Sequence, residues 1–265
     1  MNDAVVSALE QVRSTTPLTH CVTNTVVQPL TANVLLAAGA APAMVEMPGE
    51  AGVLASVANA VLINLGTINA QQVDGIREAA ASAHENGTPW VLDPVAIGAL
   101  PIRTALAKEL LACKPAAIRG NASEIMALAG GEGGRGVDST ASVDDATAIA
   151  RDLAREVGCV VAISGPVDYI TDGERAVECA NGDALLTLIT GAGCSLGALV
   201  AAYCGANEDK LVATAAAHAV VGIAAERAAR ECAGPGSFQV GWLDGLSQVD
   251  ARVLAEQAKV EWVQQ

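Results

Sequence analysis

The sequence has few aromatic residues and few basic side chains. Aromatic residues make up 2% of the 265 residues, and 15 basic against 29 acidic side chains give a formal net charge of −14. Nucleic acids and anionic membrane surfaces are bound through clustered lysine and arginine side chains. We therefore expect neither a nucleic acid nor a membrane as a partner.

Long apolar runs are also missing. The longest candidate, residues 211–225, contains His218 and is followed by Glu226-Arg227, so it falls short of the roughly 18 residues that cross a membrane. The start, Met1-Asn2-Asp3, lacks the basic residues and apolar stretch of a signal peptide. These features favour a cytoplasmic protein.

Several chemical signatures are absent as well. The seven cysteines include no C-x-x-C pair and mostly lie in apolar runs, which argues against a disulfide framework. None of the three histidines stands at ligand spacing from a cysteine pair, which argues against a zinc site. No lysine follows a glycine, so the P-loop motif of many nucleotide-binding proteins is missing.

The sequence does contain an alternation of short apolar runs and longer helical patterns. Such alternation is typical of β-α-β units and of a mostly parallel sheet covered by helices on both faces. It predicts a three-layer α/β/α fold and, because no linker divides the chain, a single domain over residues 1–265. The predicted strands are Leu18–Val22, Ala41–Val45, Ala60–Leu65, Trp90–Leu92, Ala116–Ile118 and Cys159–Ile163.

Capping residues and turn signals place the remaining elements. Asp172-Gly173 is a strong turn dipeptide that predicts a hairpin between residues 168–171 and 175–179, and therefore an antiparallel edge. Residues 130–136 are read as a glycine-rich loop, with helical pattern resuming at Val143. Helices are predicted over 26–38 (ending at Gly39), 70–85 (after an Asn69 cap, stopping at Gly87), from Pro101, over 208–230, and over 243–260 after a break at 234–236.

Polar or glycine residues follow the end of almost every predicted strand. Ligands of parallel sheets bind beyond the carboxyl ends of the strands. Each segment alone also fits a helix cap or a turn, but together they indicate a binding site. The segments are Thr23-Asn24, Met44-Val45-Glu46, 64–67, Asp93-Pro94, 119–121, Ser164-Gly165 and 190–194.

The strongest local signal is Thr190-Gly191-Ala192-Gly193-Cys194, which leads into an alanine-rich helix. Glycines let the backbone approach a ligand closely, and the unpaired N–H groups of a first helical turn stabilise negative charge. Ala192, Gly193 and Cys194 are therefore predicted to form an anion hole. A cysteine at a helix start is expected to have a lowered pKa, which would make Cys194 a base or a nucleophile. The alternative is a buried cysteine that only begins the helix.

These residues fit a phosphoryl-transfer site. Such a site needs an anion hole, a base near the attacking hydroxyl group, a carboxylate for Mg²⁺ and a cation for the donor phosphates. Cys194 is the candidate base, Glu124 the carboxylate and Arg119 the cation, and Asp93 is a candidate for a second, metal-linked water. The spacing of Asn121 and Glu124 also describes an ordinary helix cap.

Longer segments extend the pattern over most of the chain. They are 17–24, 35–44, 64–67, 92–95, 118–125, 136–139, 190–194 and 234–238. In these segments the sequence resembles the hydroxyethylthiazole kinases of thiamine salvage, members of the ribokinase-like superfamily. Related sugar and pyrimidine kinases usually have an aspartate at the position of Cys194, so the cysteine points to the thiazole kinases.

The resemblance implies a specific reaction and assembly. It implies phosphorylation of the primary hydroxyl group of 5-(2-hydroxyethyl)-4-methylthiazole by ATP, with Mg²⁺, in a homotrimer whose active sites lie at subunit interfaces. The matching positions are Met44, Gly191 and Asn24 for the thiazole, Arg119 and Ser164 for ATP, Cys194 for the hydroxyl group, and Glu124 and Asp93 for the metal and phosphate region.

Two other functions fit the same residues. A kinase of this fold that acts on another small alcohol, such as a hydroxymethylpyrimidine or pyridoxine, can be separated only by substrate competition. A non-catalytic protein that binds a thiazole or a nucleotide would not require the base, the anion hole and Arg119 together, and this combination favours the enzyme.

Overall fold

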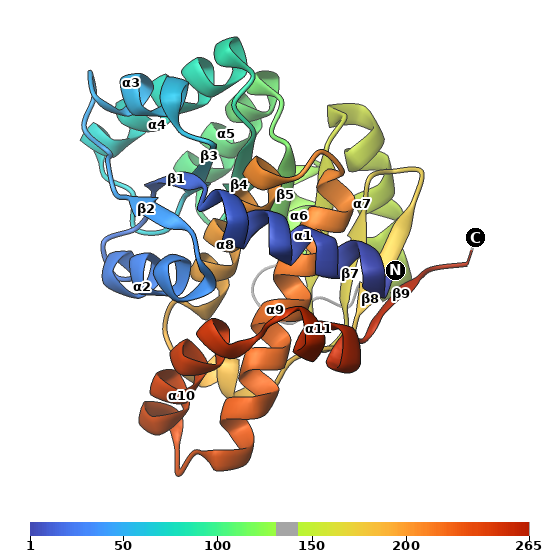
Figure 1. The fold of residues 1–265 in the computed structure, drawn as a ribbon. Coiled ribbons are helices and arrows are strands. Elements are labelled where there is room, and N and C mark those ends of the chain that lie inside the picture. The colour runs from blue at the N-terminus through green and yellow to red at the C-terminus, as the bar shows by residue number, and fades with distance from the viewer. Residues whose placement is uncertain (131–142, 265) are drawn as a thin grey trace.

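The computed structural model describes residues 1–130 and 143–264, which form one nine-stranded sheet between two layers of helices (Figure 1). The strand order is β2-β1-β3-β4-β5-β6-β7-β8-β9. In this order the pairings from β2 through β6 are parallel, and those from β6 through β9 are antiparallel. The strands are β1 (Leu18–Val22), β2 (Ala41–Ala43), β3 (Ala60–Asn64), β4 (Trp90–Asp93), β5 (Ala117–Asn121), β6 (Val160–Ser164), β7 (Asp168–Thr171), β8 (Ala176–Cys179) and β9 (Val260–Trp262).

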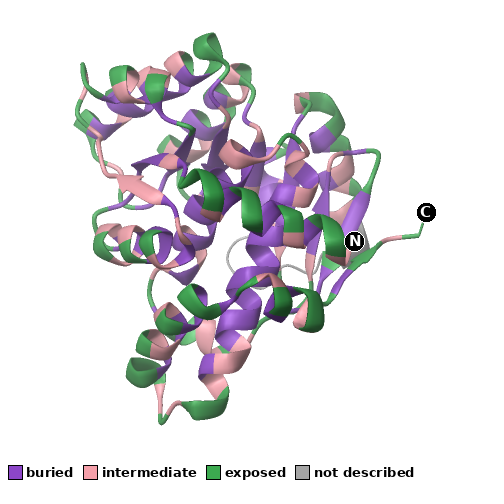
Figure 2. Ribbon diagram, in the orientation of Figure 1, coloured by how far each residue is buried: buried purple, intermediate pink, exposed green. Residues whose placement is uncertain are grey.

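The sheet separates two apolar cores, because successive side chains of a strand point to opposite faces. In β3, Leu62 belongs to one core, whereas Val61 and Ile63 belong to the other. Figure 2 shows the central strands buried and the outer faces of the surrounding helices exposed. Burial on both faces explains why the parallel strands have near-continuous apolar sequences.

Six helices pack on the first face of the sheet and five on the second, within the described residues. The first layer contains α1 (Asn2–Thr15), α2 (Gln28–Ala38), α8 (Ala192–Ala206), α9 (Lys210–Glu231), α10 (Pro235–Gln248) and α11 (Ala251–Gln257). The second contains α3 (Ala51–Val57), α4 (Ala70–Asn86), α5 (Pro101–Leu110), α6 (Ala122–Leu128) and α7 (Val143–Val157). Two short 3₁₀ helices are η1 (Leu111–Cys113) and η2 (Ala184–Leu188).

The predicted three-layer architecture and most element positions are confirmed. Asn69 and Gln72 form a capping box at the start of α4, and Gly39 and Gly87 adopt left-handed conformations at the ends of α2 and α4. The hairpin of β7 and β8 turns at Gly173, whose φ is 93°. Helix α7 begins at Val143 as predicted, whereas residues 131–136 of the predicted loop lie outside the described residues.

The predicted helix over residues 243–260 is wrong. Helix α10 already begins at Pro235, shortly after α9 ends at Glu231. Helix α11 starts anew after Asp250, whose side chain accepts a hydrogen bond from the Val253 N–H at 2.8 Å. Residues 260–262 form strand β9, in which Val260 pairs with Cys179 of β8. This pairing joins segments about 80 residues apart, so local periodicity could not predict it. The second predicted strand is also too long, since β2 ends at Ala43.

Helix α9 is long and apolar enough, by length and composition alone, to cross a membrane. In this structure 83% of its apolar stretch is buried within the protein. It packs against α8, α10 and α1, and its burial is that of a core helix.

Candidate active site

The carboxyl ends of the parallel strands meet at one edge of the sheet and gather most of the predicted site residues. Asn64 lies opposite Asp93 in the β3–β4 pairing, and Asn121 lies opposite Ser164 in the β5–β6 pairing. Arg119 lies on β5, two residues before Asn121. Asn24 and Met44 follow the ends of β1 and β2.

Helix α8 starts at the centre of this edge. Its N-cap, Gly191, has a φ of 95°, and a Cβ atom there would lie 2.7 Å from Cγ1 of Val27. Both the left-handed backbone conformation and the close contact with Val27 therefore require glycine at this position. The N–H of Ser195 donates to the carbonyl of Gly191 at 2.9 Å. The preceding N–H groups, of Ala192, Gly193 and Cys194, belong to the first turn and have no partner within the helix. Their placement fits the predicted anion hole.

Two asparagines connect Cys194 to the carboxyl group of Asp93. Nδ2 of Asn24 donates to Sγ of Cys194 at 3.5 Å and to Oδ1 of Asn64 at 3.0 Å. Oδ1 of Asn64 also accepts the N–H of Gly66 at 2.9 Å, and its Nδ2 donates to Oδ2 of Asp93 at 2.7 Å. Asn24 and Asn64 are buried, so these hydrogen bonds fix the orientation of both amides.

The expected lowering of the Cys194 pKa is wrong. Burial of the thiol raises its pKa above the ordinary cysteine value, and the nearby carboxyl group of Asp93 raises it further. The hydrogen bonds from Asn64 and Asn24 and the charge of Arg119 act in the opposite direction but do not outweigh burial. A helix start lowers a thiol pKa when the sulfur stays near solvent, whereas here desolvation dominates. Cys194 is therefore a thiol, not a thiolate, near neutral pH.

Asp93 is the most perturbed carboxyl group of this edge. It is 1% exposed, and burial raises its pKa to about 7 against the attraction of Arg119 and the hydrogen bond from Asn64. The charge of Glu124 raises the pKa of Asp93 further, so the two carboxyl groups repel each other. A cation between them would relieve this repulsion.

Glu124, the predicted metal residue, also has a structural role as part of a helix cap. Its Oε2 accepts the N–H of Asn121 at 2.9 Å and its Oε1 accepts the N–H of Ala96 at 2.9 Å. The side chain thus completes the capping box of α6 and leaves one lone pair on each oxygen. No cluster of three or more His, Cys, Asp or Glu side chains is found in the described part of the chain. Two carboxylates still suit Mg²⁺, which keeps several waters and shares the phosphates of its substrate.

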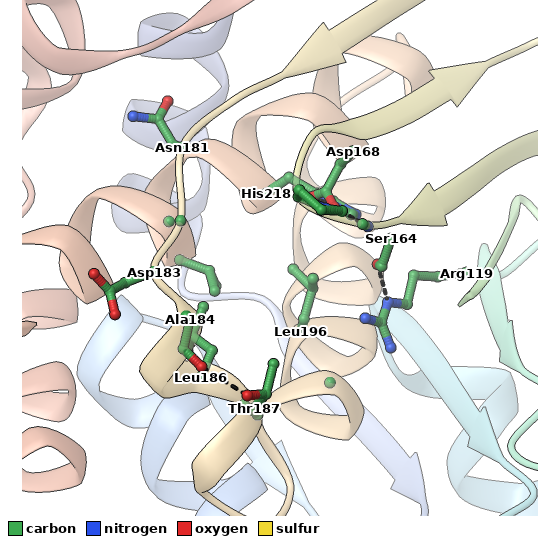
Figure 3. Close-up of a pocket in the computed structure, with 17 residues that line it drawn as sticks. Arg119, Ser164, Asp168, Asn181, Asp183, Ala184, Leu186, Thr187, Leu196 and His218 are labelled. Carbon is green, nitrogen blue, oxygen red and sulfur yellow. Dashed lines mark hydrogen bonds and ion pairs between the residues drawn. The ribbon is translucent and has the colours of Figure 1, made fainter. Parts of the chain in front are cut away.

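Arg119 joins this edge to a cavity of about 650 Å³ (Figure 3). Its Nε donates to Oγ of Ser164 at 3.0 Å, and a Cβ atom at Gly193 would lie 2.9 Å from its Nη1. The guanidinium group therefore lies against the start of α8 and at the cavity wall. The cavity continues past Leu196 towards His218 on α9 and the segment 181–187, which includes most of η2.

Met44 lies in the segment after β2, which other side chains hold in place. Nε2 of Gln72 and Nε2 of Gln28 donate to Oε2 of Glu46 at 2.7 and 3.1 Å. Nε2 of His20 lies 2.6 Å from the carbonyl oxygen of Val45. The segment after β2 is thus fixed from β1, α2 and α4, although its sequence alone carries no sign of this.

Several residues of the site were missed by sequence reasoning. Asn64 was noted only as a strand end, yet it bridges Asn24, Gly66 and Asp93. Its two polar neighbours across the sheet become visible only with the strand order. Asp168 and His218, 50 residues apart, meet at 2.6 Å in the cavity wall, and no local pattern connects them.

A nine-stranded, mainly parallel sheet with its polar residues gathered at one edge around a glycine-led helix start defines a protein of the ribokinase-like fold. The fold is shared with a ribokinase-like superfamily protein from Enterococcus faecalis V583, which is 10% identical and superposes with a TM-score of 0.66 over 90% of this chain and 89% of that one. The chain belongs to the hydroxyethylthiazole kinase family, whose model matches residues 9–252.

Two similar proteins agree with this membership. A hydroxyethylthiazole kinase from Kineococcus radiotolerans is 53% identical over 94% of this chain and 90% of its own. A solved hydroxyethylthiazole kinase from Pyrococcus horikoshii OT3 is 39% identical, with a TM-score of 0.88 over 98% of this chain and 99% of that one. The resemblance inferred from the sequence is confirmed.

Proposed function

We propose that the protein transfers the γ-phosphoryl group of ATP to the primary hydroxyl group of 5-(2-hydroxyethyl)-4-methylthiazole, a reaction of thiamine salvage. The observation that carries this proposal is the contact of Asn24 with Cys194 at the start of α8, beside Arg119. This contact supports the proposal because phosphoryl transfer needs an acceptor group, donors for the developing charge and a phosphate-binding cation close together. Family membership over residues 9–252 supports the substrate.

In this proposal the two sides of the α8 start bind the two substrates. Met44, Gly191 and Asn24 contact the thiazole, and Arg119 and Ser164 contact ATP. The N–H groups of 192–194 stabilise the charge that develops on the transferred phosphoryl group. The cavity beyond Arg119 supports the nucleotide assignment, because it leads away from the acceptor side.

Cys194 is proposed to position the hydroxyl group. Because the thiol has a raised pKa, little thiolate exists to remove a proton early in the reaction. Phosphoryl transfer needs little base strength when attacking and leaving oxygens are held in line. We expect Cys194→Ala to lower kcat about 100-fold and Cys194→Ser to retain more turnover than Cys194→Ala. Equal loss in both variants would instead favour a thiolate base.

Mg²⁺ fits the carboxyl groups of Asp93 and Glu124. A bound Mg²⁺ would neutralise phosphate charge during transfer. Asp93 is held towards this position by Asn64, and Glu124 by the N–H groups of Asn121 and Ala96. Both carboxylates can act through water, since their oxygens already accept hydrogen bonds.

We further propose a single kinase domain over residues 1–265 that assembles as a homotrimer in the cytoplasm. One continuous sheet supports the single domain, and seven free cysteines suit a reducing compartment. Four apolar side chains that follow β1 and β2 in the chain support an interface, because they are 54–69% exposed in the single chain. They are Val26, Met47, Val53 and Val57.

The test of the proposed function is ADP release from Mg-ATP with a panel of acceptors. The panel contains the hydroxyethylthiazole, a hydroxymethylpyrimidine, pyridoxine, ribose and no acceptor. We expect release only with the thiazole. Release with another alcohol would move the substrate assignment, and no release from folded protein with any acceptor would overturn the kinase proposal in favour of a binding protein.

A further inference from the structure

A histidine and an aspartate form a buried pair in the wall of the cavity next to Arg119. Nδ1 of His218, on α9, lies 2.6 Å from Oδ2 of Asp168, the first residue of β7. The His218 side chain is fully buried, and that of Asp168 is 14% exposed. Because a carboxylate can only accept, Nδ1 of His218 carries the hydrogen and donates it. Figure 3 shows the pair beside Ser164 and on the same wall as Arg119.

Both oxygens of Asp168 are already engaged. Oδ2 accepts from His218, and Oδ1 accepts the N–H of Gly165 at 2.9 Å. Burial alone would raise the pKa of this carboxyl group, but His218, the Gly165 N–H and the positive charge of Arg119 outweigh it and lower the pKa. Asp168 is therefore an anion, and it lies close enough to Arg119 to be stabilised by it.

Arg119 nevertheless does not pair with this anion. In the described part of the chain Arg119 forms no ion pair within 4.0 Å, and its side-chain hydrogen bond runs from Nε to Oγ of Ser164. Its two terminal nitrogens stay at the cavity and near Gly193. Pairs of arginine with a carboxylate are frequently two-point pairs, whereas here both Asp168 oxygens accept from His218 and Gly165 instead.

We propose that His218 is a positioning residue for the nucleotide: it holds the Asp168 carboxylate against α9 and so keeps the terminal nitrogens of Arg119 available to the phosphates of ATP. Without His218, Asp168 would turn towards Arg119 and compete with the nucleotide for the same donors. The same hydrogen bonds anchor Gly165, the residue after Ser164, and thereby fix the hydroxyl group that orients Nε of Arg119. This inference rests on the proposed function, since it assigns the cavity to ATP.

The first test is nucleotide affinity in His218→Leu. We expect Kd for Mg-ADP, measured by isothermal titration, and KM for ATP each to rise about tenfold, or roughly 1.4 kcal/mol. KM for the thiazole should stay unchanged, because the acceptor side is not touched. His218→Asn should restore most of the affinity, since its Nδ2 can donate from nearly the same place as Nδ1 of histidine.

A second substitution separates competition from general damage. In the His218→Leu background, Asp168→Asn removes the negative charge that would capture Arg119, so we expect the double variant to bind Mg-ADP more tightly than His218→Leu alone. If His218 only supports the packing of α9, the second change should weaken binding further. Thr214→Val is the matched control. Thr214 lies one turn earlier on α9, is fully buried and does not line the cavity, and its hydroxyl group donates to the Lys210 carbonyl at 2.7 Å.

Two results would overturn the inference. One is a Kd for Mg-ADP in His218→Leu within twofold of the parent protein, and the other is a double variant that binds no better than the single one. Titration with Mg-ADP needs no acceptor, so the result is independent of which alcohol is phosphorylated. If the unmodified protein does not bind Mg-ADP, the proposed kinase function itself is contradicted.

Discussion

At the scale of single residues, burial decides which groups of the site carry charge. The thiol of Cys194 is raised in pKa by burial and by Asp93. We predict that its alkylation by iodoacetamide is slow at pH 7 and that the rate still rises above about pH 9. The rate is measured by mass spectrometry of the peptide that contains Cys194, with urea-unfolded protein as the reference. An alkylation rate that levels off below pH 7 would show that Cys194 is a thiolate near neutral pH and would contradict the raised pKa.

Asp93 links the site to the pH dependence of stability. Its pKa is raised to about 7 in the folded protein, whereas an unfolded chain has an aspartate pKa of about 3.9. The folded state therefore binds the proton more tightly, and stability is lost as pH rises from about 4 to 7. We predict that Asp93→Asn raises the free energy of unfolding at pH 8, without Mg²⁺, by up to about 4 kcal/mol.

Urea unfolding at a series of pH values checks this prediction. The advantage of Asp93→Asn should grow between about pH 4 and 7 and then stay constant. Asp250→Asn is a control whose effect on stability has the opposite pH dependence. The hydrogen bond from the Val253 N–H lowers the pKa of Asp250, so the contribution of Asp250 to the free energy of unfolding is lost as pH falls. An Asp93→Asn advantage that does not change with pH would contradict a raised pKa.

At the scale of the elements, the cavity next to Arg119 depends on the close approach of α9 to the segment before η2. A Cβ atom at Gly222 would collide with the backbone carbonyl group of Asn181. The side chain of Asn181 is in turn fixed by the Lys259 N–H at 2.7 Å and by the Gln257 carbonyl at 2.9 Å. The segment cannot yield without disturbing the C-terminal strand.

We therefore predict that Gly222→Ala lowers the free energy of unfolding by about 1–3 kcal/mol and raises KM for ATP. Urea unfolding and initial rates at varied ATP measure the two effects. Gly236→Ala on α10 is the control, because a Cβ atom at Gly236 would meet no other atom within 4 Å, and alanine favours a helix over glycine. Equal stability of both variants would contradict the tight contact.

The elements that sequence reasoning predicted are those whose cause is local. Apolar runs bounded by caps located β1 and β3, and Pro101 and Asn69 marked the starts of α5 and α4. Strand β9 depends on pairing with β8, and helix α3 has only seven residues, so neither has a strong local signal.

The site residues likewise include some that a local sequence pattern predicts and others that depend on contacts between distant segments. Residues that follow the ends of predicted strands, such as Asn24, Asp93 and Arg119, were identified because parallel strands bring their ends together. The protonation of Cys194 was mispredicted because desolvation depends on everything packed around the thiol. The pairing of His218 with Asp168 depends on how α9 lies against β7, which no single segment encodes.

At the scale of the whole molecule, the exposed apolar side chains between β2 and the end of α3 favour a partner surface. Val53 and Val57 on α3 are 68% and 69% exposed, and Met47, between β2 and α3 in the chain, is 54% exposed. Exposed apolar groups gathered near a binding pocket are typical of an interface. In the proposed trimer this surface closes the thiazole pocket with a second subunit.

We predict that the protein sediments at about three times the mass of its 26.6 kDa chain, and that Val53→Glu with Val57→Glu yields monomers. Because the acceptor pocket is then incomplete, thiazole-dependent ADP release should fall with the trimer, while Mg-ADP binding remains. Trp262→Glu is the control: Trp262 is 44% exposed on β9, at the opposite edge of the sheet from β2, and should leave the trimer intact. A monomer in the unmodified protein, or a trimer that survives both valine substitutions, would remove the α3 surface from the assembly.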